Sequence, residues 1–446
     1  MANDQNEIID SITVVGLGKI GLTLAAVFAN NGYKVYGADI NEEVVSTVNQ
    51  GRSHIKNEPG LSELVSEAHN NKTLCATTVT SEAVKQSNII IVIVPVLVDE
   101  DNQIDYQFID CAVLDIAEGL TKGSLIIFET TIPPGDTRNR FGKKIEEISG
   151  LNMGSDFYLA YSPERVYSNR IIQDLKRYPK IVGGINQKSL ELAKEFYADA
   201  LKCELLEVSS LETAEFSKIA ECVYRDVNIA LANELARFAD KNNVNILEVI
   251  AASNSQPFSH IHDPGIGVGG HCIPVYPYFF INKGLTEGLT PLARKINDHM
   301  ADFALSKIEQ EIGVLKDKNV LILGLSYRGN VKEPTKSTAL MLIEELKERH
   351  ANVFVNDPQF TDVEIEKYNV QPLKLNDSFV GEIDIVIHQA NHKEYENLDF
   401  TKFKKCKLVL DGRNTLNKDE INHLNITYIG FTEQPSFFYN QRVFLS

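Results

Sequence analysis

The sequence lacks the features that mark several classes of protein. It has 61 acidic against 44 basic residues and a formal net charge of −17, whereas a nucleic-acid-binding protein needs a basic face. Its longest apolar run, residues 89–98, contains a proline and is too short to cross a bilayer. The opening MANDQNE has neither the basic segment nor the apolar stretch of a secretory signal. We therefore expect no nucleic-acid partner, no membrane association and a cytoplasmic location.

Cysteine is also sparse, and its spacing argues against two kinds of site. The chain has six cysteines, which are Cys75, Cys111, Cys203, Cys222, Cys272 and Cys406. No two of them form a Cys-x-x-Cys pair, so the spacing fits neither a disulfide framework nor a zinc motif. We expect reduced thiols and no metal site. The remaining composition, 43% hydrophobic and 24% charged over 446 residues, is that of a globular protein with two or three domains.

The N-terminal region carries the fingerprint of a dinucleotide-binding fold. A β-branched strand begins at Ser11 and runs into Gly16-Leu-Gly18-Lys-Ile-Gly21, a helical pattern follows, and a second strand ends at Asp39. The glycines allow a tight turn and let a pyrophosphate reach the helix N-terminus, and the acid accepts hydrogen bonds from a ribose. Because the Asp39 charge would repel a 2′-phosphate, NAD is favoured over NADP. A doubly wound fold without a dinucleotide is the alternative.

Further apolar segments fit the same sheet, and a long helix follows them. Residues 89–98, 124–129 and 158–161 are predicted as buried strands. From Leu211 to about Asn242, apolar residues recur at helical spacing without glycine or proline. A helix of this length and apolarity predicts packing against a copy of itself, and hence a homodimer or a higher homo-oligomer. A core helix in a monomer is the alternative.

A second α/β block begins near Asp317 and echoes the first. A strand ends at Gly324, a helix is predicted over 336–350, and the next strand ends at Asp357. Because the glycine fingerprint is incomplete here, we predict a second nucleotide-type fold with a different ligand. The predicted fold class is α/β, with two Rossmann-like, doubly wound domains joined by a long central helix and a helical dimerisation domain. The predicted domain bounds are 1–205, 206–312 and 313–446.

One thiol follows an unusually glycine-rich stretch. In Gly265-Ile-Gly-Val-Gly-Gly-His-Cys272-Ile-Pro-Val-Tyr276-Pro, the glycines let backbone and ligand approach closely. A single thiol in this position suits covalent catalysis at a carbonyl. The alternative is a glycine-rich turn followed by a buried, inert cysteine.

Several segments then occur in a specific order along nearly the full chain. They are 16–21 with Asp39, 129–135, 162–166, Lys218 with 225–228, 269–272, 324–328 and 411–414. In this order they resemble the UDP-glucose/GDP-mannose dehydrogenase family. The resemblance implies an NAD-binding domain, a central helical dimer domain and a C-terminal UDP-binding domain. It also implies that a UDP-sugar is oxidised twice at C6, from alcohol to acid, with two NAD consumed.

The resemblance also implies roles for individual residues. Cys272 would add to the aldehyde from the first oxidation, and the thiohemiacetal would be oxidised to a thioester that water hydrolyses. Lys218 would supply positive charge near the developing oxyanion, and Glu164 and Thr131 would position or activate the water. Without the family, Lys218 is a solvated helix lysine and Glu164 a loop acid or helix cap. The further residues implied are Pro95 and Thr131 at the cofactor, and Arg165, Cys222, Gly269, Tyr276, Arg328 and Arg413 at the substrate.

Two segments narrow the substrate. Ser162-Pro-Glu-Arg-Val166 looks like the members that act on UDP-N-acetylhexosamines, because the UDP-glucose enzymes carry Asn-Pro-Glu-Phe-Leu there. Residues 327–333 favour the same group. We therefore predict UDP-N-acetylmannosamine or UDP-N-acetylglucosamine as substrate, with UDP-glucose as the alternative.

Four positions depart from the family pattern. Cys222 replaces an asparagine, Tyr276 an aspartate, Phe258 an arginine that reaches a neighbouring subunit's substrate, and Val96 a threonine after Pro95. Cysteine and tyrosine carry no full charge at neutral pH, so three hypotheses follow. The site performs both oxidations in a rebuilt form, it stops early as aldehyde or thioester, or the protein binds a UDP-sugar without turnover. We favour the first, because Lys218, Glu164 and Cys272 are retained.

Two further alternatives concern the thiols and the class of enzyme. A shared pocket would permit a Cys222–Cys272 disulfide, which a reducing cytoplasm opposes. A two-electron 3-hydroxyacid-type dehydrogenase would share the N-terminal fold and the long helix. Such an enzyme needs neither Cys272 nor residues 317–446, so both count against it.

Overall fold

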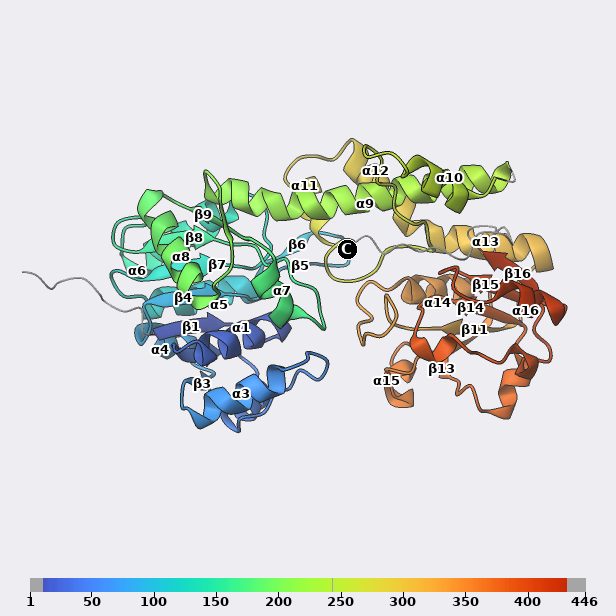
Figure 1. Cartoon of the computed structure of the whole chain (residues 1–446), viewed down its shortest axis with the longest axis horizontal. Helices are drawn as coiled ribbons and strands as arrows, with labels where there is room; N and C mark the ends of the chain where they lie inside the picture. Colours follow the sequence, from blue (N-terminus) through green and yellow to red (C-terminus); the bar gives the residue numbers. More distant parts are fainter. Residues whose placement is uncertain (1–10, 243, 431–446) are drawn as a thin grey trace, which may run out of the picture. The chain divides into compact units, whose positions relative to one another are not determined.

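Figure 1 shows a computed structural model of the chain, which describes residues 11–242 and 244–430. The chain divides into two compact units. The first comprises the residues up to Glu221 together with Tyr278–Gly284, and the second comprises Cys222–Pro277 together with the residues from Leu285 onward. Each unit contains one large sheet, which confirms the two predicted Rossmann-like sheets. The three domain bounds stay predictions.

The first sheet, coloured from blue to green in Figure 1, has eight strands in the order β10-β9-β8-β7-β4-β1-β2-β3. Crossovers lead outward from β1 in both directions, as in a doubly wound fold. One pair is antiparallel, since β9 runs against β8 with Ala160 opposite Gly184. The composition of a buried strand does not encode its direction, so the sequence did not predict this reversal. The strands are β1 (Ser11–Val15), β2 (Lys34–Ala38), β3 (Leu74–Thr77), β4 (Ile89–Val92), β7 (Leu125–Phe128), β8 (Tyr158–Tyr161), β9 (Lys180–Gly184) and β10 (Leu205–Glu207).

Side chains at the helix starts explain several boundaries in this unit. Asn41 accepts from the backbone N–H of Glu43 where α2 begins, and Asn186 accepts from that of Ser189 where α8 begins. The helices are α1 (Lys19–Asn30), α2 (Glu42–Asn49), α3 (Leu61–Asn70), α4 (Thr80–Lys85), α5 (Gln107–Gly119), η1 (Thr137–Gly142), α6 (Lys143–Ser149), α7 (Ile171–Arg177) and α8 (Gln187–Ala200).

The apolar run at 89–98 is only partly a strand. β4 ends at Val92, and the Thr130 hydroxyl donates to the Val94 carbonyl at 2.8 Å. Residues 93–96 belong to no strand, Pro95 is exposed, and β5 (Leu97–Val98) then pairs antiparallel with β6 (Ile104–Asp105). The prediction of one buried strand through residue 98 was therefore wrong for its second half, because proline ends the ladder.

The long helix predicted from Leu211 is confirmed as α9 (Leu211–Lys241). Its residues from Cys222 onward belong to the second unit. There Asp226 accepts from Arg294 at 2.6 Å and from Asn297 at 2.8 Å, all three side chains being buried. The other helices of the central region are α10 (Ile246–Ser253), α11 (Tyr276–Ile281), α12 (Leu289–Asp298) and α13 (Met300–Ile312). In the described part of the chain, every helix is too short or too polar to span a bilayer.

The second sheet, orange to red in Figure 1, is parallel throughout, in the order β13-β12-β11-β14-β15-β16. Along β11, Val320 and Ile322 join one hydrophobic cluster while Leu321 and Leu323 join another. Both faces are thus covered, as a parallel sheet requires. The strands are β11 (Asn319–Leu323), β12 (Asn352–Asn356), β13 (Gln371–Pro372), β14 (Ile385–His388), β15 (Leu408–Asp411) and β16 (Thr427–Gly430). The helices are α14 (Thr338–Glu348), α15 (Asp362–Glu366), η2 (Ser378–Glu382), η3 (Lys393–Tyr395), η4 (Phe400–Lys402) and α16 (Lys418–His423).

Candidate active site

The three fingerprint glycines meet different surroundings after β1. Gly16 has φ +94°, and a Cβ there would lie 2.9 Å from the Ile93 carbonyl oxygen. A Cβ on Gly21 would lie 1.9 Å from the Gly16 oxygen, so this glycine allows α1 to pack on the turn. At Gly18 a Cβ would meet nothing within 4 Å. The first and last glycines therefore serve the fold, while Gly18 leaves open space where a diphosphate can approach the backbone.

The N-terminus of α1 and Asp39 complete this edge. Gly18 is the N-cap of α1 and places no side chain over its first N–H groups, which suits an anionic ligand. The Asp39 carboxylate is oriented by two backbone donors, Leu17 N–H at 2.8 Å and Asn41 N–H at 2.9 Å. It is only half-buried, so it keeps acceptor capacity for a ribose. The residues present fit NAD.

A buried cluster of charged side chains lies at the other half of this sheet. The Lys180 ammonium is 2.6 Å from a carboxylate oxygen of Glu129 and 2.6 Å from one of Glu164. Tyr197 donates its hydroxyl to the second oxygen of Glu129 at 2.5 Å. The second oxygen of Glu164 accepts from the backbone N–H of Arg165 at 2.6 Å and of Val166 at 3.1 Å. Glu164 is thus held from both sides.

The surroundings of Glu129 and Glu164 shift the pKa values of the two carboxyl groups in opposite directions. Burial raises the pKa of Glu129, and the nearby Glu164 charge adds to the effect against the opposing charge of Lys180. Burial alone would also raise the pKa of Glu164, but the Lys180 charge and hydrogen bond, the Arg165 N–H and the Lys218 charge bring it below its ordinary value. Of the two, Glu164 is therefore the carboxyl group whose surroundings favour the ionised form.

The other predicted residues of this unit lie in the loops that follow β4, β7 and β8 and on α9. Lys218 is half-buried on α9, and Thr131 is 7% exposed, just after β7. Arg165 donates from its guanidinium to the Pro179 carbonyl, so part of its donor capacity is used within the protein. Pro95 is exposed.

In the second unit, two asparagines of α9 hold the segment that leads to Cys272. The Asn228 side chain donates to the His260 carbonyl at 2.7 Å and accepts from the His262 N–H at 2.9 Å. The Asn233 side chain accepts from the Gly265 N–H at 2.9 Å. Both ends of the loop 260–265 are therefore fixed to the helix before the glycines begin.

The glycine-rich stretch packs against the second sheet's loops. A Cβ on Gly269 would lie 2.5 Å from the Tyr327 Cβ, and Gly270, at φ +95°, donates its N–H to the Thr335 carbonyl at 2.9 Å. The half-buried Cys272 follows, and its carbonyl accepts from the Tyr276 N–H at 2.9 Å. Cys222 is 3% exposed on α9. The six cysteines form no disulfide in the described residues.

A pocket of about 430 Å³ in the second unit brings together three of the predicted substrate residues, Gly269, Arg328 and Arg413, with Arg225. Arg413 also donates to the Tyr327 carbonyl at 2.9 Å. Three arginines in one pocket suit a diphosphate, because the guanidinium group pairs with phosphate oxygens through several hydrogen bonds. Its other lining residues are Ile229, Leu247, Asp263, Pro264, Gly265, Gly267, Val268, Ile273, Tyr327, Asn391, Gly412 and Asn414.

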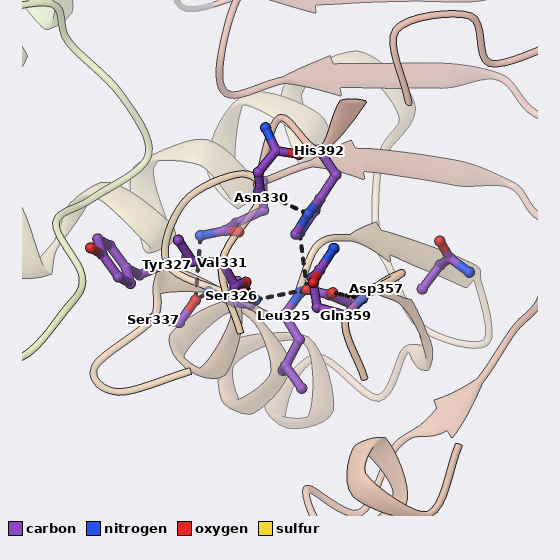
Figure 2. A network of polar contacts seen from close by, with 12 residues as sticks. Leu325, Ser326, Tyr327, Asn330, Val331, Ser337, Asp357, Gln359 and His392 are labelled. Atoms are coloured by element: carbon purple, nitrogen blue, oxygen red, sulfur yellow. Dashed lines mark hydrogen bonds and ion pairs between the residues drawn. The ribbon is translucent and has the colours of Figure 1, made fainter. Parts of the chain in front are cut away.

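Next to the loop that carries Tyr327, the Asp357 carboxylate joins several segments by hydrogen bonds (Figure 2). Its carboxylate accepts from the backbone N–H groups of Leu325 at 2.8 Å and Ser326 at 3.0 Å, and contacts Nε2 of His392 at 3.1 Å. The Asn330 N–H lies 3.1 Å from Nδ1 of the same ring. Because a backbone N–H can only donate, Nδ1 is the acceptor and Nε2 carries the proton given to Asp357. The loop that forms one wall of the pocket is thereby fixed.

Sequence reasoning missed several residues of this arrangement. Arg225 and Asn228 lie inside a matched segment, but no role was predicted for them. Glu129 and Lys180 were missed because their partnership depends on which strands are neighbours. The only available signal was a lysine opening an otherwise apolar strand.

Family models match most of the chain in three consecutive segments. The NAD-binding domain of the UDP-glucose/GDP-mannose dehydrogenase family matches residues 10–201, its central domain 212–299 and its UDP-binding domain 321–418. The protein is thus an NAD-dependent dehydrogenase of nucleotide sugars. The chain belongs to the UDP-glucose/GDP-mannose dehydrogenase family.

Individual relatives are similar to this chain over nearly their whole length. The UDP-N-acetyl-D-mannosamine dehydrogenase of Pyrococcus horikoshii is 34% identical over 423 residues, covering 93% of this chain and 97% of the relative. A solved structure of UDP-D-ManNAc dehydrogenase from that organism has a TM-score of 0.84 at 33% identity, covering 94% and 99% of the two chains. A UDP-glucose dehydrogenase structure from Pyrobaculum islandicum also has a TM-score of 0.84, at 25% identity, covering 97% and 100%.

Proposed function

We propose that this chain oxidises UDP-N-acetylmannosamine at C6 to the uronic acid, with two NAD reduced per sugar. The supporting observation is the likeness to UDP-N-acetyl-D-mannosamine dehydrogenases at 34% and 36% identity over more than nine-tenths of the chain. UDP-N-acetylglucosamine and UDP-glucose are the alternative substrates. The fold does not choose among them, because a UDP-glucose dehydrogenase has the same TM-score of 0.84 as the mannosamine enzyme.

The first unit would hold the cofactor and supply the water-activating groups. NAD, when bound, accepts the electrons of each oxidation. Gly18 and the open N-terminus of α1 would hold its diphosphate and Asp39 its ribose, with Pro95 and Thr131 nearby. Glu164, helped by Thr131, would take a proton from the attacking water. Lys218 would balance the developing oxyanion.

The second unit would hold the substrate and the nucleophile. Arg328 and Arg413 would bind the diphosphate, and Gly269 would allow the close approach of the substrate. The Cys272 sulfur would bond to the aldehyde carbon, giving a thiohemiacetal and then a thioester. In the last step a water oxygen bonds to the thioester carbon and the carbon–sulfur bond breaks. Arg165, Cys222 and Tyr276 are proposed as further substrate contacts.

The test is to count NADH formed per sugar consumed, using NAD and a panel of UDP-N-acetylmannosamine, UDP-N-acetylglucosamine and UDP-glucose. The proposal expects two NADH and a uronate, fastest with the first sugar. Cys272→Ala should abolish acid formation, whereas the matched variant Cys111→Ala, at an exposed cysteine of α5, should not change it. One NADH with free aldehyde, or binding without NADH, would instead mean that Cys222 and Tyr276 have changed the chemistry. Cys222→Asn and Tyr276→Asp would then be expected to restore the second oxidation.

We also propose that two copies associate through α9. Large apolar side chains recur along this helix at exposed positions, with Phe216 43%, Tyr224 54%, Leu231 46% and Phe238 67% exposed. Burying such a stripe favours association. Light scattering should give twice the chain mass or a higher multiple, and Leu231→Glu with Phe238→Glu should lower it. A wild-type monomer at micromolar concentration would refute the association.

A further inference from the structure

We propose that Lys180 is a positioning residue of the reaction: it keeps Glu164 ionised and aimed, while Glu129 anchors Lys180 from the opposite side. This rests on the proposed function, since it concerns the hydrolysis of the thioester by water. Lys180 itself is 5% exposed, so it acts through Glu164 rather than on the substrate.

The geometry leaves Glu164 one direction in which to receive a proton. A carboxylate offers about four acceptor positions on its two oxygens. One oxygen accepts from the Arg165 and Val166 N–H groups, and the other accepts from Lys180 at 2.6 Å. One acceptor position therefore remains, on the oxygen that Lys180 touches. Lys180 thus fixes both the charge of this oxygen and the direction of its remaining lone pair.

The position of Lys180 depends on the antiparallel pairing of β9 with β8. Lys180 opens β9, which runs against β8, and Glu164 follows the end of β8. The Ser162 hydroxyl donates to the Ile181 carbonyl at 2.7 Å and fixes the loop over β9. The pairing of β9 with β8 and this loop contact together bring the lysine and the glutamate into contact.

The cluster is poorly explained by stability alone. Desolvating three charged groups costs more than a single pairing returns, so a buried ion cluster is weak evidence for a stabilising role. Here one cation serves two carboxylates, and they respond differently. Glu129 also accepts from Tyr197 and is fully enclosed, whereas the Glu164 side chain is 12% exposed. Two carboxyl groups with opposed environments are the usual sign of an acid–base assignment.

The chemical consequence concerns the final step. Water bonds to the thioester carbon, the bond to the Cys272 sulfur breaks, and the proton of the water moves to the Glu164 carboxylate. A Glu164 that already carries a proton cannot accept another one. Without the charge of Lys180, this state would persist to higher pH, and the thioester would accumulate.

The experiment compares the pH profile of acid formation in wild type, Lys180→Met, Lys180→Arg and Glu129→Gln. Lys180→Met should move the acidic limb up by about one to three pH units, while Lys180→Arg should leave it near the wild-type position. Glu129→Gln removes the competing carboxylate and should move the limb down or leave it. Lys122→Met, at a lysine that pairs with Asp156 and is 75% exposed, is the matched control and should match wild type.

A second readout does not depend on turnover. After mixing with NAD and UDP-N-acetylmannosamine below pH 7, intact-mass spectrometry should show a covalent adduct on Cys272 in Lys180→Met that wild type clears. If Lys180→Met fails to fold, the double variant Glu129→Gln/Lys180→Met removes the unpaired charge, and its acidic limb should still lie above that of Glu129→Gln alone.

The two ideas fail in different ways. If wild type forms no NADH with any UDP-sugar, the proposed function is wrong. If wild type forms two NADH, but Lys180→Met only lowers the rate equally at every pH and leaves no adduct, the positioning role is refuted while the function stands.

Discussion

The two sheets begin with the same local geometry and end with different binding capacities. Gly16 and Gly324 have φ values of +94° and +99°, and the next N–H, of Leu17 or Leu325, donates at 2.8 Å to an aspartate after the second strand. In the first sheet this acid is the half-buried Asp39. In the second it is Asp357, 3% exposed. The same strand–glycine–strand–acid pattern therefore leaves a partly exposed acid in one unit and serves the fold in the other.

What surrounds the turn decides between these outcomes. α1 begins at Lys19, directly after the open Gly18. α14 begins only at Thr338, and the Ser337 hydroxyl accepts from its first turn. A Cβ on Gly267 would lie 2.7 Å from the Thr338 hydroxyl, so the glycine-rich stretch also covers this helix end. A strand ending in glycine thus indicates a dinucleotide site only when an uncapped helix follows at once.

The difference between the two units is tested most directly by replacing Asp357 and Asp39 in turn. Asp357→Ala should lower the free energy of unfolding by about 3–6 kcal/mol, because the buried N–H groups of Leu325 and Ser326 and the half-buried one of Gln359 lose their acceptor. Asp39→Ala should cost about 1 kcal/mol and mainly weaken NAD binding. Urea unfolding and NAD titration of both variants check this. Equal losses of stability would contradict the distinction.

A second test compares how the two units hold α9. Burial raises the pKa of Glu215, which accepts from Gly135 and Thr137 N–H in the first unit, to about 7. In the second unit burial raises the pKa of Asp226 to about 6, against the charge of Arg294. A raised folded-state pKa means that the folded state binds the proton more tightly, so stability falls as pH rises from the unfolded value toward the folded one.

The pH window therefore differs between the units. Glu215 should contribute a loss of at most about 3 kcal/mol, spread between its ordinary pKa of 4.5 and about pH 7. The loss from Asp226 should be complete by about pH 6. Glu215→Gln should flatten the dependence of the melting temperature between pH 6 and 7, as measured by calorimetry. An unchanged slope in that variant would disprove the assignment.

The smallest expected effect comes from a single added atom, the Cβ of a Gly18→Ala variant. Gly18→Ala adds a Cβ that meets no protein atom within 4 Å, so the melting temperature should stay within a degree or two of wild type. The same Cβ should obstruct the diphosphate and weaken NAD binding about tenfold, about 1.4 kcal/mol. Calorimetric titration with NAD measures this, with UDP as the control ligand. An equal loss of UDP affinity would show that the substitution acts through the fold.

Local signals predicted the elements well, and pairings between distant strands poorly. The helix expected from Leu211 to about Asn242 is observed as Leu211–Lys241, because its periodicity is a property of neighbouring residues. The strand–glycine–strand–acid segments were equally readable. The contact of Lys180 with Glu129 and Glu164 was not, because it depends on strand order and on the reversal of β9.

The candidate site divides in the same way. Gly269, Arg328 and Arg413 were found through ordered motifs, and the structure brings them to one pocket. Asn233, which fixes the start of the thiol loop, has no motif of its own. Its role is evident only from the hydrogen bond that its side chain accepts from the Gly265 N–H. Residues that support a site through the backbone leave little trace in a single sequence.

The first unit is built from two separate stretches of chain, because Tyr278–Gly284 returns to it after the chain has entered the second unit. In that short segment Lys283 pairs with Asp136 at 2.6 Å, and Asn282 donates to the Asn102 carbonyl at 2.8 Å. A gene cut after Glu221 would discard both contacts, even though the whole first sheet would be retained. A cofactor module transferred by simple end-to-end fusion would therefore lose this segment and its two contacts with the first unit. A graft that keeps the first unit whole must carry residues 278–284 as well as the residues up to Glu221.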